Sequence, residues 1–580
     1  MTTAGRAGGG WVRRWPWLPA LAVAALGLGL TLHGLGSHPL VDFDEAVHAG
    51  FIRRMARGGG WLVPVFDGSV RLRKPPLYFW LGALVVLAGG HASALADRLP
   101  SALAGVALAV LLAEVARRRW GLGRVGWVAG AGLLTMPYFL LLSRSAMLDA
   151  LSAALVAAAV LAGSWWLRGR GGAGMAALTG LALGLTVLER SAMVLLPLAI
   201  LAVDGLGLRA WRRVRLRDAG LAAGLACLVG AAWPLAMTIE YGGFFWHQYL
   251  VRNVLARGAS HVESHPRPVY YYLPLLAAGL GAWAPPLALA MTTSWRRAWR
   301  EPDSIERLAA IWILVGVGLF SVAGTKLPWY MAPVYPGCAL LLAGFLHRWL
   351  APGGDPSGAP TSRETALLVG AAGLGVAMGL WPDPRPVGAL GVAGLVGLAG
   401  LWASRSQRSA VPARSGGGPT GVAGWGGGRR AAGSLALAAV LAVALGRAAL
   451  FPATIGSPGL AMSLQPEPPA AAEAALGAVA ARAPGVPLGI VGDTYPTVLY
   501  YSRRATITTF PGGLRAAARA RGLWLVLPAA QLPALRHLVA VTTLARAAPL
   551  VLVALPGAPQ GEPARLAADM RSPAPRTGGR

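Results

Sequence analysis

The residues best suited to chemistry in this chain include its two lysines, Lys74 and Lys326, because the other basic residues among its 52 are arginines. Arginine presents a planar fork, whereas lysine is a compact point charge on a flexible stem, so a site shaped for one need not accept the other. Each lysine lies beside a long apolar stretch, and a proline follows it at once or one residue later. We interpret them as functional ammonium groups. The alternative is that two lysines persist by chance at membrane borders.

Acidic residues at two positions could complete such a site. Asp44 and Glu45 open a predicted amphipathic helix, and they could do no more than cap it and interact with its dipole. Asp149 lies at the mouth of a predicted span, where a carboxylate is costly unless it is paired or functional. An ion pair between Asp149 and Arg144 is the simpler explanation there. Together, the acids and lysines suit transfer chemistry on a phosphate-bearing substrate, in which an acid accepts a proton and cations stabilise a leaving phosphate.

Aromatic and histidine side chains precede a later span, in "SHPRPVYYYLPLL". The tyrosines, Tyr271 among them, are typical of an aromatic belt at a membrane interface. His265 could contact a phosphate or a metal, although a lone histidine usually does neither. Tyr330, four residues after Lys326, joins Arg144, His265 and Tyr271 as a candidate for substrate binding. The sequence contains no HExxH, Walker or CxxC motif that would argue for another chemistry.

Composition places the chain in a membrane. Hydrophobic residues make up 55% of the sequence and charged residues 13%, which exceeds what a soluble domain could bury. The net charge of +29 could suggest nucleic acid, but the arginines cluster in short loops between apolar runs, as the positive-inside rule describes. We therefore expect a lipid bilayer and no nucleic acid as partner. Cys227 and Cys338 fall inside predicted spans, so the sequence implies neither a disulfide framework nor a thiolate metal site.

The apolar runs predict an α-helical polytopic protein of about thirteen transmembrane helices in the cell membrane. The spans are 15–35, 98–116, 122–142, 147–167, 172–188, 190–206, 218–240, 270–293, 306–323, 328–346, 364–381, 386–404 and 431–450. The segment 76–90 would break the alternation of arginine-rich loops, so we expect it to lie at the membrane surface or to re-enter. Residues 36–97 then form one extracytoplasmic loop. The acids, the lysines, Arg190 and His265 would all face that compartment.

The sequence predicts one large membrane domain and several smaller segments. We predict that residues 1–450 form the membrane domain and that 405–430 is a cytoplasmic Gly/Ser/Arg linker within it. Residues 451–555 should form a small extracytoplasmic α/β domain. Its strands are expected in "PLGIVGDTYPTVLYYSRRATITTF" and "GLWLVLP", and its helices in "LRAAARARG" and "QLPALRHLV". Residues 556–580 read as a disordered tail.

Six motifs, in order over roughly 38–346, resemble one known family. They are "FDEAVHAGFIRRMARGGGWLVPVFDG…LRKPPLYFW", "ADRLPSALAG", "SRSAMLDALSA", "LERSAMVLLP", "HPRPVYYYLPLLAAGLGAWAP" and "SVAGTKLPWYMAPVYPGCALLLAG". These motifs are similar to those of polyprenyl-phosphate-sugar glycosyltransferases with the GT-C fold, in the lipid A aminoarabinose transferase-like branch of the protein O-mannosyltransferase superfamily. The 487–555 segment weakly resembles that branch's extracytoplasmic domain.

The resemblance implies specific roles. Asp44 would be the base or acceptor-orienting acid with Glu45 beside it, and Asp149 would be the second acid. Lys74, Arg190 and Lys326 would hold the lipid phosphate, with Arg190 standing where relatives commonly have lysine. No cofactor is certain: relatives often carry a carboxylate just before the first lysine, and Arg73 at that position puts any dependent divalent metal in doubt.

These features predict a membrane glycosyltransferase that moves a sugar from a polyprenyl phosphate to a lipid or protein acceptor at the extracytoplasmic face. The alternative is a transporter or flippase of a lipid-linked sugar, in which the same charges would bind rather than react. A transporter would more naturally show charges at mid-membrane and two related halves, and the sequence has no such repeat.

Overall fold

The computed structural model describes most of the chain in two compact units. Its described residues are 17–40, 44–119, 126–259, 267–350, 362–380, 435–436, 438–446, 470–491, 496–502, 508–510 and 513–558. The first unit comprises residues 1–33 and 100–454, and the second comprises 34–99 and 455–580. The predicted linker, residues 559–580 of the predicted tail and the span 386–404 lie outside the described residues.

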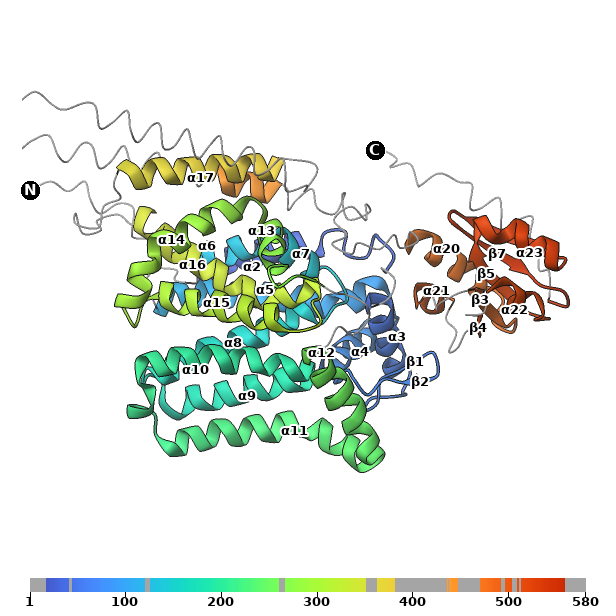
Figure 1. Ribbon diagram of the computed structural model, residues 1–580, viewed down its shortest axis with the longest axis horizontal. Helices are drawn as coiled ribbons and strands as arrows, with labels where there is room; N and C mark the ends of the chain where they lie inside the picture. Colours follow the sequence, from blue (N-terminus) through green and yellow to red (C-terminus); the bar gives the residue numbers. More distant parts are fainter. Residues whose placement is uncertain are drawn as a thin grey trace, which may run out of the picture. The chain divides into compact units, whose positions relative to one another are not determined.

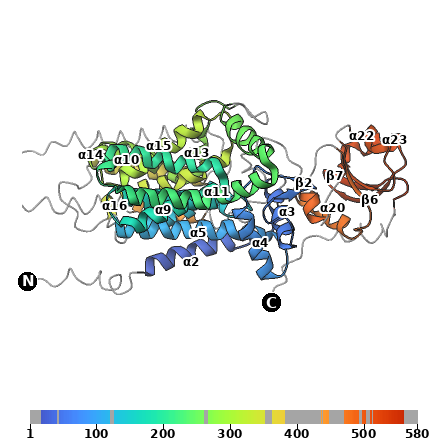
Figure 2. The same cartoon turned by 90° about the horizontal axis from the view of Figure 1, so that it is seen from below.

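The first unit is built of helices. Their bounds are α2 (Leu18–Leu32), α6 (Trp127–Leu134), α7 (Pro137–Ser143), α8 (Asp149–Leu167), α9 (Gly172–Arg190), η3 (Ser191–Val194), α10 (Leu195–Leu208), η4 (Ala210–Arg212), α11 (Leu216–Trp246), the π-helix η5 (His247–Leu255), α12 (Ala256–Ala259), α13 (Tyr272–Leu280), η7 (Gly281–Trp283), α14 (Ala284–Arg300), α15 (Ile305–Val322), η8 (Pro328–Val334), α16 (Tyr335–Leu350) and α17 (Ser362–Leu380). Figure 1 shows α8, α9, α10 and α11 side by side, and Figure 2 shows α9 running along α11.

The length and hydropathy of the helices confirm the prediction of a membrane protein. Within the described parts of the chain, seven helices are long and apolar enough to cross a membrane. The predicted span 122–142 is instead interrupted, because Met136 is extended just before Pro137 and α7 begins at that proline. A proline disfavours helical backbone at the residue before it. The segment 76–90 forms α4 (Leu77–Gly89), whose 13 residues fall short of the roughly 20 that a spanning helix needs.

The second unit joins two distant parts of the sequence. Residues 34–99 contribute α3 (Asp44–Ala56), the hairpin of β1 (Val65–Phe66) and β2 (Ser69–Val70), α4 and the first turns of α5 (Ala94–Arg119). We had predicted this segment as a loop of the membrane domain. The structure groups it with the C-terminal segment, because α21 (Pro496–Tyr501) packs against α3.

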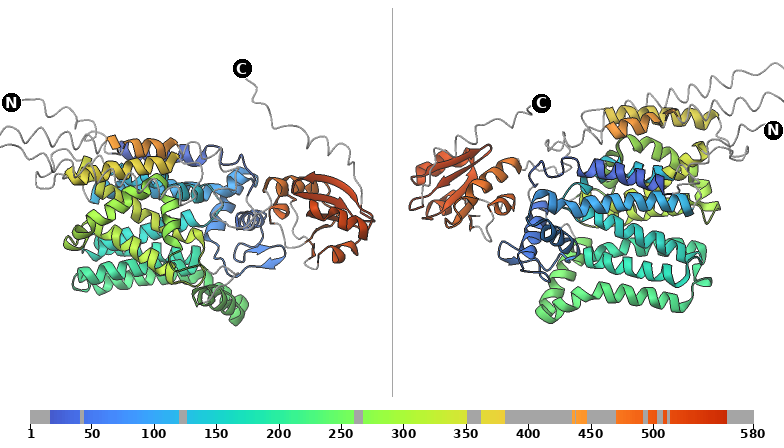
Figure 3. Two further views of the ribbon diagram at one scale, coloured as in Figure 1. Left: turned by 45° about the horizontal axis from the view of Figure 1, so that its top comes forward. Right: turned by 180° about the vertical axis from the view of Figure 1, so that it is seen from behind.

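The C-terminal segment is the expected α/β fold. Besides α21 it contains α20 (Ala470–Ala481), α22 (Leu514–Ala518), η11 (Ala529–Gln531), α23 (Leu532–Leu538), and the strands β3 (Leu488–Val491), β4 (Thr508–Phe510), β5 (Trp524–Pro528), β6 (Thr542–Ala547) and β7 (Leu550–Ala554). The strand order is β4-β3-β5-β7-β6, with β3 parallel to both neighbours and the β6–β7 hairpin antiparallel. Figure 3 shows this sheet in red with its helices beside it.

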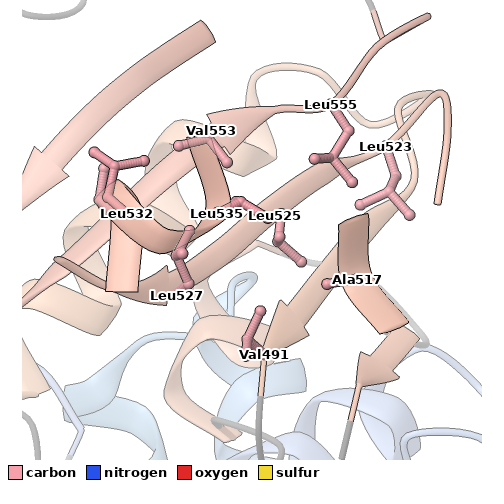
Figure 4. Packing of buried hydrophobic residues seen from close by; sticks show 10 residues of the cluster. Val491, Ala517, Leu523, Leu525, Leu527, Leu532, Leu535, Val553 and Leu555 are labelled. Carbon is pink, nitrogen blue, oxygen red and sulfur yellow. The ribbon is translucent and has the colours of Figure 1, made fainter. Parts of the chain in front are cut away.

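A buried apolar cluster holds this sheet to its helices. Leu525 and Leu527 of β5 and Val553 of β7 lie with Leu535 of α23 in one cluster (Figure 4). Alternate residues of a strand point to the same face, so one row of leucines and valines covers one side of the sheet. The sequence "PTVLYY", which we had placed in a strand region, forms the helix α21 instead.

Candidate functional site

Asp44 and Lys74 form an ion pair in the second unit. Lys74 Nζ donates to Asp44 Oδ1 at 2.7 Å, and the two side chains are 34% and 39% exposed, respectively. Asp44 is the first residue of α3, as the amphipathic pattern predicts, and Lys74 lies in the turn before α4. The structure therefore brings together two of the predicted site residues, within reach of solvent and of a ligand.

His48 completes this group, and sequence reasoning missed it. Its Nε2 lies 2.7 Å from Lys74 Nζ, and its side chain is buried. His48 follows Asp44 by four residues on α3, so the two side chains lie on the same helix face. That spacing was the signal that could have found it.

Glu45 has a different environment from its neighbour Asp44. Both of its carboxylate oxygens accept hydrogen bonds from the Arg98 guanidinium, at 2.8 and 2.9 Å, and both side chains are buried. Arg98 also donates to the backbone carbonyls of Leu35, His38 and Pro39. The bidentate pair fastens the start of α3 to α5 and to the segment preceding α3. This geometry gives Glu45 an anchoring contact, and the catalytic role that the resemblance implies for it stays a prediction.

The C-terminal segment also contacts this part of the second unit. Tyr500 donates its hydroxyl proton to Asp97 Oδ2 at 2.5 Å, and Arg53 of α3 stacks over the Tyr500 ring and donates to its carbonyl oxygen. Burial, together with the nearby charge of Asp97, raises the pKa of the Tyr500 phenol. The phenol therefore remains protonated and donates. The neighbouring Tyr501 hydroxyl accepts from the Leu40 backbone N–H at 3.1 Å.

A second charged group lies in the first unit, where α8 begins and α9 ends. Arg190 Nη1 donates to Asp149 Oδ1 at 2.7 Å, and the Asp149 side chain is fully buried. Ser152, one turn further along α8, donates to the carboxylate of Glu189 at 2.7 Å. Sequence reasoning missed Glu189 and Ser152. The pairing of Asp149 with Arg190 links a predicted acid with a predicted phosphate-binding residue.

Lys326 lies in the segment before η8. Its Nζ donates to the Ala323 carbonyl at 2.7 Å, and the side chain is largely buried. The Tyr272 hydroxyl donates to the Leu327 carbonyl at 3.0 Å, which fixes the backbone beside the lysine. Since η8 packs against α8, the Lys326 segment adjoins the helix that begins at Asp149. Tyr330, within η8, contacts the Phe320 ring with centroids 5.6 Å apart.

The remaining candidates for substrate binding have other surroundings. Arg144 is buried and donates to the carbonyls of Leu30, Thr31 and His33 at the end of α2. It satisfies carbonyls that a helix end leaves open, which is a structural role. Tyr271 has the Arg267 guanidinium 5.4 Å from its ring centroid. His265 lies outside the described residues.

The described residues offer no metal site. Within those ranges, no three His, Cys, Asp or Glu side chains gather as ligands would. Arg73 stands before Lys74, where the resemblance would place a carboxylate. The part of the chain that the structure describes thus shows no ligand set for a divalent metal, and we derive no step through one.

Comparison with known proteins supports the resemblance. Residues 73–236 match the family described as Dolichyl-phosphate-mannose-protein mannosyltransferase. The undecaprenyl phosphate-alpha-4-amino-4-deoxy-L-arabinose arabinosyl transferase of Pseudomonas paraeruginosa is 32% identical over 353 residues, which cover 58% of this chain and 61% of that protein. The transferase of the same description from Enterobacter sp. is 29% identical over 312 residues, covering 52% and 54%. The chain is similar to these transferases over the matched residues.

The fold agrees with that similarity. The crystal structure of ArnT from Cupriavidus metallidurans bound to undecaprenyl phosphate is similar over 93% of this chain and 98% of its own, with a TM-score of 0.66 and 19% identity. This likeness confirms the predicted GT-C fold with its small C-terminal α/β part. With seven candidate spans, the chain is a multi-pass membrane protein. The matches span only about half to six-tenths of the curated relatives' length.

Proposed function

We propose that this protein transfers a sugar from a polyprenyl-phosphate donor to a lipid or protein acceptor at the extracytoplasmic face of the membrane. The observation that carries the proposal is the Asp44–Lys74 pair, a partly exposed carboxylate hydrogen-bonded to an ammonium at 2.7 Å. An acid and a cation held side by side serve the two events of such a transfer, removal of the acceptor's proton and departure of the phosphate. The acid accepts a proton, and the cation stabilises negative charge.

Asp44 acts as the base in this proposal. Its carboxylate accepts the proton of the acceptor's hydroxyl or amine while that nucleophile attacks the anomeric carbon of the sugar. The bond between the anomeric carbon and the phosphate oxygen breaks, and its electron pair leaves with the polyprenyl phosphate. Glu45 is not available for this step, because both of its oxygens are engaged by Arg98. We assign it the role of anchoring α3.

Lys74 is the cation that we assign to the donor phosphate in the second unit, where it stabilises the charge that develops on the leaving group. Lys326 and Arg190, in the first unit, stay candidates for phosphate binding that the resemblance implies. An ammonium has three N–H donors. In the described part of the chain, Lys74 uses two of them on Asp44 and His48, and Lys326 uses one on Ala323. Each lysine thus retains donors for phosphate oxygens. Asp149 orients Arg190 through its ion pair.

The relatives' names suggest undecaprenyl phosphate-linked 4-amino-4-deoxy-L-arabinose as the first donor to test. The full chain would be purified in detergent, and native mass spectrometry would identify the lipid that co-purifies with it. The donor would then be supplied with a membrane lipid extract, and with extracted envelope proteins in a separate reaction. We expect undecaprenyl phosphate to be released and the sugar to appear on an acceptor.

The matched control is Asp44→Asn, which should bind the donor lipid and release almost no undecaprenyl phosphate. Absence of any bound polyprenyl phosphate, together with no sugar transfer from the donor, would contradict the proposal. Movement of the intact donor across proteoliposome membranes without transfer would establish the transporter alternative.

A further inference from the structure

We propose that His48 is a positioning residue for Lys74, holding its ammonium beside Asp44 so that a remaining N–H faces the donor phosphate. This inference rests on the proposed function. The Lys74 Nζ atom lies 2.7 Å from His48 Nε2 and 2.7 Å from Asp44 Oδ1. The two acceptors are 4.0 Å apart and stand one turn from each other on α3. Two acceptors on one face of α3 thus hold the ammonium of Lys74, which lies in the turn before α4.

The contact between Lys74 and His48 defines the protonation state of the His48 imidazole. An ammonium group has donors and no acceptor, so Nε2 of His48 must accept the hydrogen bond. The ring is then neutral and carries its proton on Nδ1. A protonated His48 would set two cations against each other in a buried place, which is unfavourable.

Packing fixes where Nε2 lies. The His48 ring lies 5.4 Å from the ring of Phe79 and 6.2 Å from that of Tyr78, both on α4. These helices approach closely at Gly82, where an added Cβ would collide with the Ile52 side chain of α3. A buried ring held in this way cannot swing toward solvent. Its nitrogen is therefore a fixed acceptor.

Lys74 needs such an acceptor because its side chain is long. A lysine loses much of its rotamer freedom when it is ordered. Asp44 is partly exposed, and exposed ion pairs hold a side chain weakly. A second bond to the buried His48 selects one position for the ammonium. The third N–H then has a defined direction, which is what recognition of a phosphate requires.

Two substitutions of His48 test this role. His48→Phe keeps an aromatic ring in the packing but removes the acceptor, whereas His48→Gln keeps a side-chain acceptor. We expect His48→Phe to lower kcat/KM for the lipid donor by about 10-fold to 100-fold, the effect of one hydrogen bond to a charged group. The KM for the acceptor should stay unchanged, and His48→Gln should recover most of the loss.

A double-mutant cycle separates positioning from packing. Lys74→Met removes the group that His48 is inferred to hold, so His48→Phe should cost nothing further in that background. Equal losses in the wild-type and Lys74→Met backgrounds would overturn the inference. So would a His48→Gln variant as impaired as His48→Phe.

Because the chain has two lysines, the reactivity of Lys74 can be measured by amine labelling without any substrate. With Lys74 and Lys326 as its two lysines, an amine-reactive reagent labels two side chains and the N-terminus, which peptide mass spectrometry distinguishes. His48→Phe should accelerate labelling of Lys74 several-fold and leave Lys326 unchanged, because an ammonium that loses an acceptor is less protected. An unchanged Lys74 rate would also overturn the inference. If labelling changes as expected but no sugar is transferred, the proposed function fails and the contact stands.

Discussion

Asp149 at the start of α8 and Arg190 at the end of α9 are joined by a hydrogen bond of 2.7 Å between Oδ1 and Nη1. One turn along α8, Ser152 donates to Glu189, the residue before Arg190. Two adjacent contacts therefore connect the same helix ends. The first is an ion pair with a fully buried carboxylate, so each partner depends on the other for its stability.

We expect Asp149→Asn and Arg190→Gln each to destabilise the protein, because each leaves the partly buried Arg190 guanidinium or the fully buried Asp149 carboxylate without its ion-pair partner. Breaking such a pair costs about 3–5 kcal/mol. The apparent Tm in detergent should fall in both single variants, and by less than the sum in the double variant. Additive falls would show that the two side chains do not stabilise each other.

Asp44→Asn should reduce turnover by roughly 10²–10⁴, since an amide cannot accept the acceptor's proton. The Tm should change little, because Asp44 is partly exposed. The measurement is release of polyprenyl phosphate from the donor at saturating substrate. Near-normal turnover would remove Asp44 from the mechanism and leave it a helix-capping residue.

Glu45→Gln tests the contrast between these adjacent acids. It replaces a buried bidentate ion pair with Arg98 by a neutral amide, so stability should fall by a few kcal/mol. Turnover per folded molecule should remain far above that of Asp44→Asn. A stable variant with turnover as low as that of Asp44→Asn would restore the catalytic role predicted for Glu45.

Lys74→Arg and Lys326→Arg should each impair use of the phosphate-bearing donor although they conserve charge. A guanidinium is larger and imposes a planar fork on a place occupied by a point charge. The readout is KM for the donor, with membrane accumulation unchanged. Arg118→Lys, at a mostly exposed side chain, serves as the matched control and should be silent. Full activity in both lysine variants would mean that the lysines persist by chance.

The predicted topology can be tested with cysteines placed on either side of α4. In a Cys227→Ser, Cys338→Ala background, Ser69→Cys and His91→Cys should both react with an impermeant thiol reagent from outside the cell. Arg170→Cys, in the predicted cytoplasmic turn between the spans 147–167 and 172–188, should react only after permeabilisation. Labelling of His91→Cys only after permeabilisation would show that α4 crosses the membrane, contrary to the prediction.

Local sequence patterns were sufficient to predict several features of this protein. Hydropathy predicted the membrane class, and the amphipathic pattern predicted the helix that begins at Asp44. The ordered motifs predicted the GT-C fold that the comparison with ArnT confirms. Apolar periodicity and short motifs depend on neighbouring residues, so the sequence alone shows them.

The partners of the charged groups were decided by the tertiary structure. Glu45 and Arg98 are 53 positions apart, and nothing local distinguishes Glu45, which is anchored, from Asp44, which is accessible. Ser152 and Glu189 meet across two helices, and Tyr500 reaches Asp97 across 403 positions. Periodicity can place a side chain on a face of its own helix. The element that covers that face depends on how the whole chain packs. That packing determines which acid stays partly exposed, as Asp44 does, and which is held in a buried ion pair, as Glu45 is.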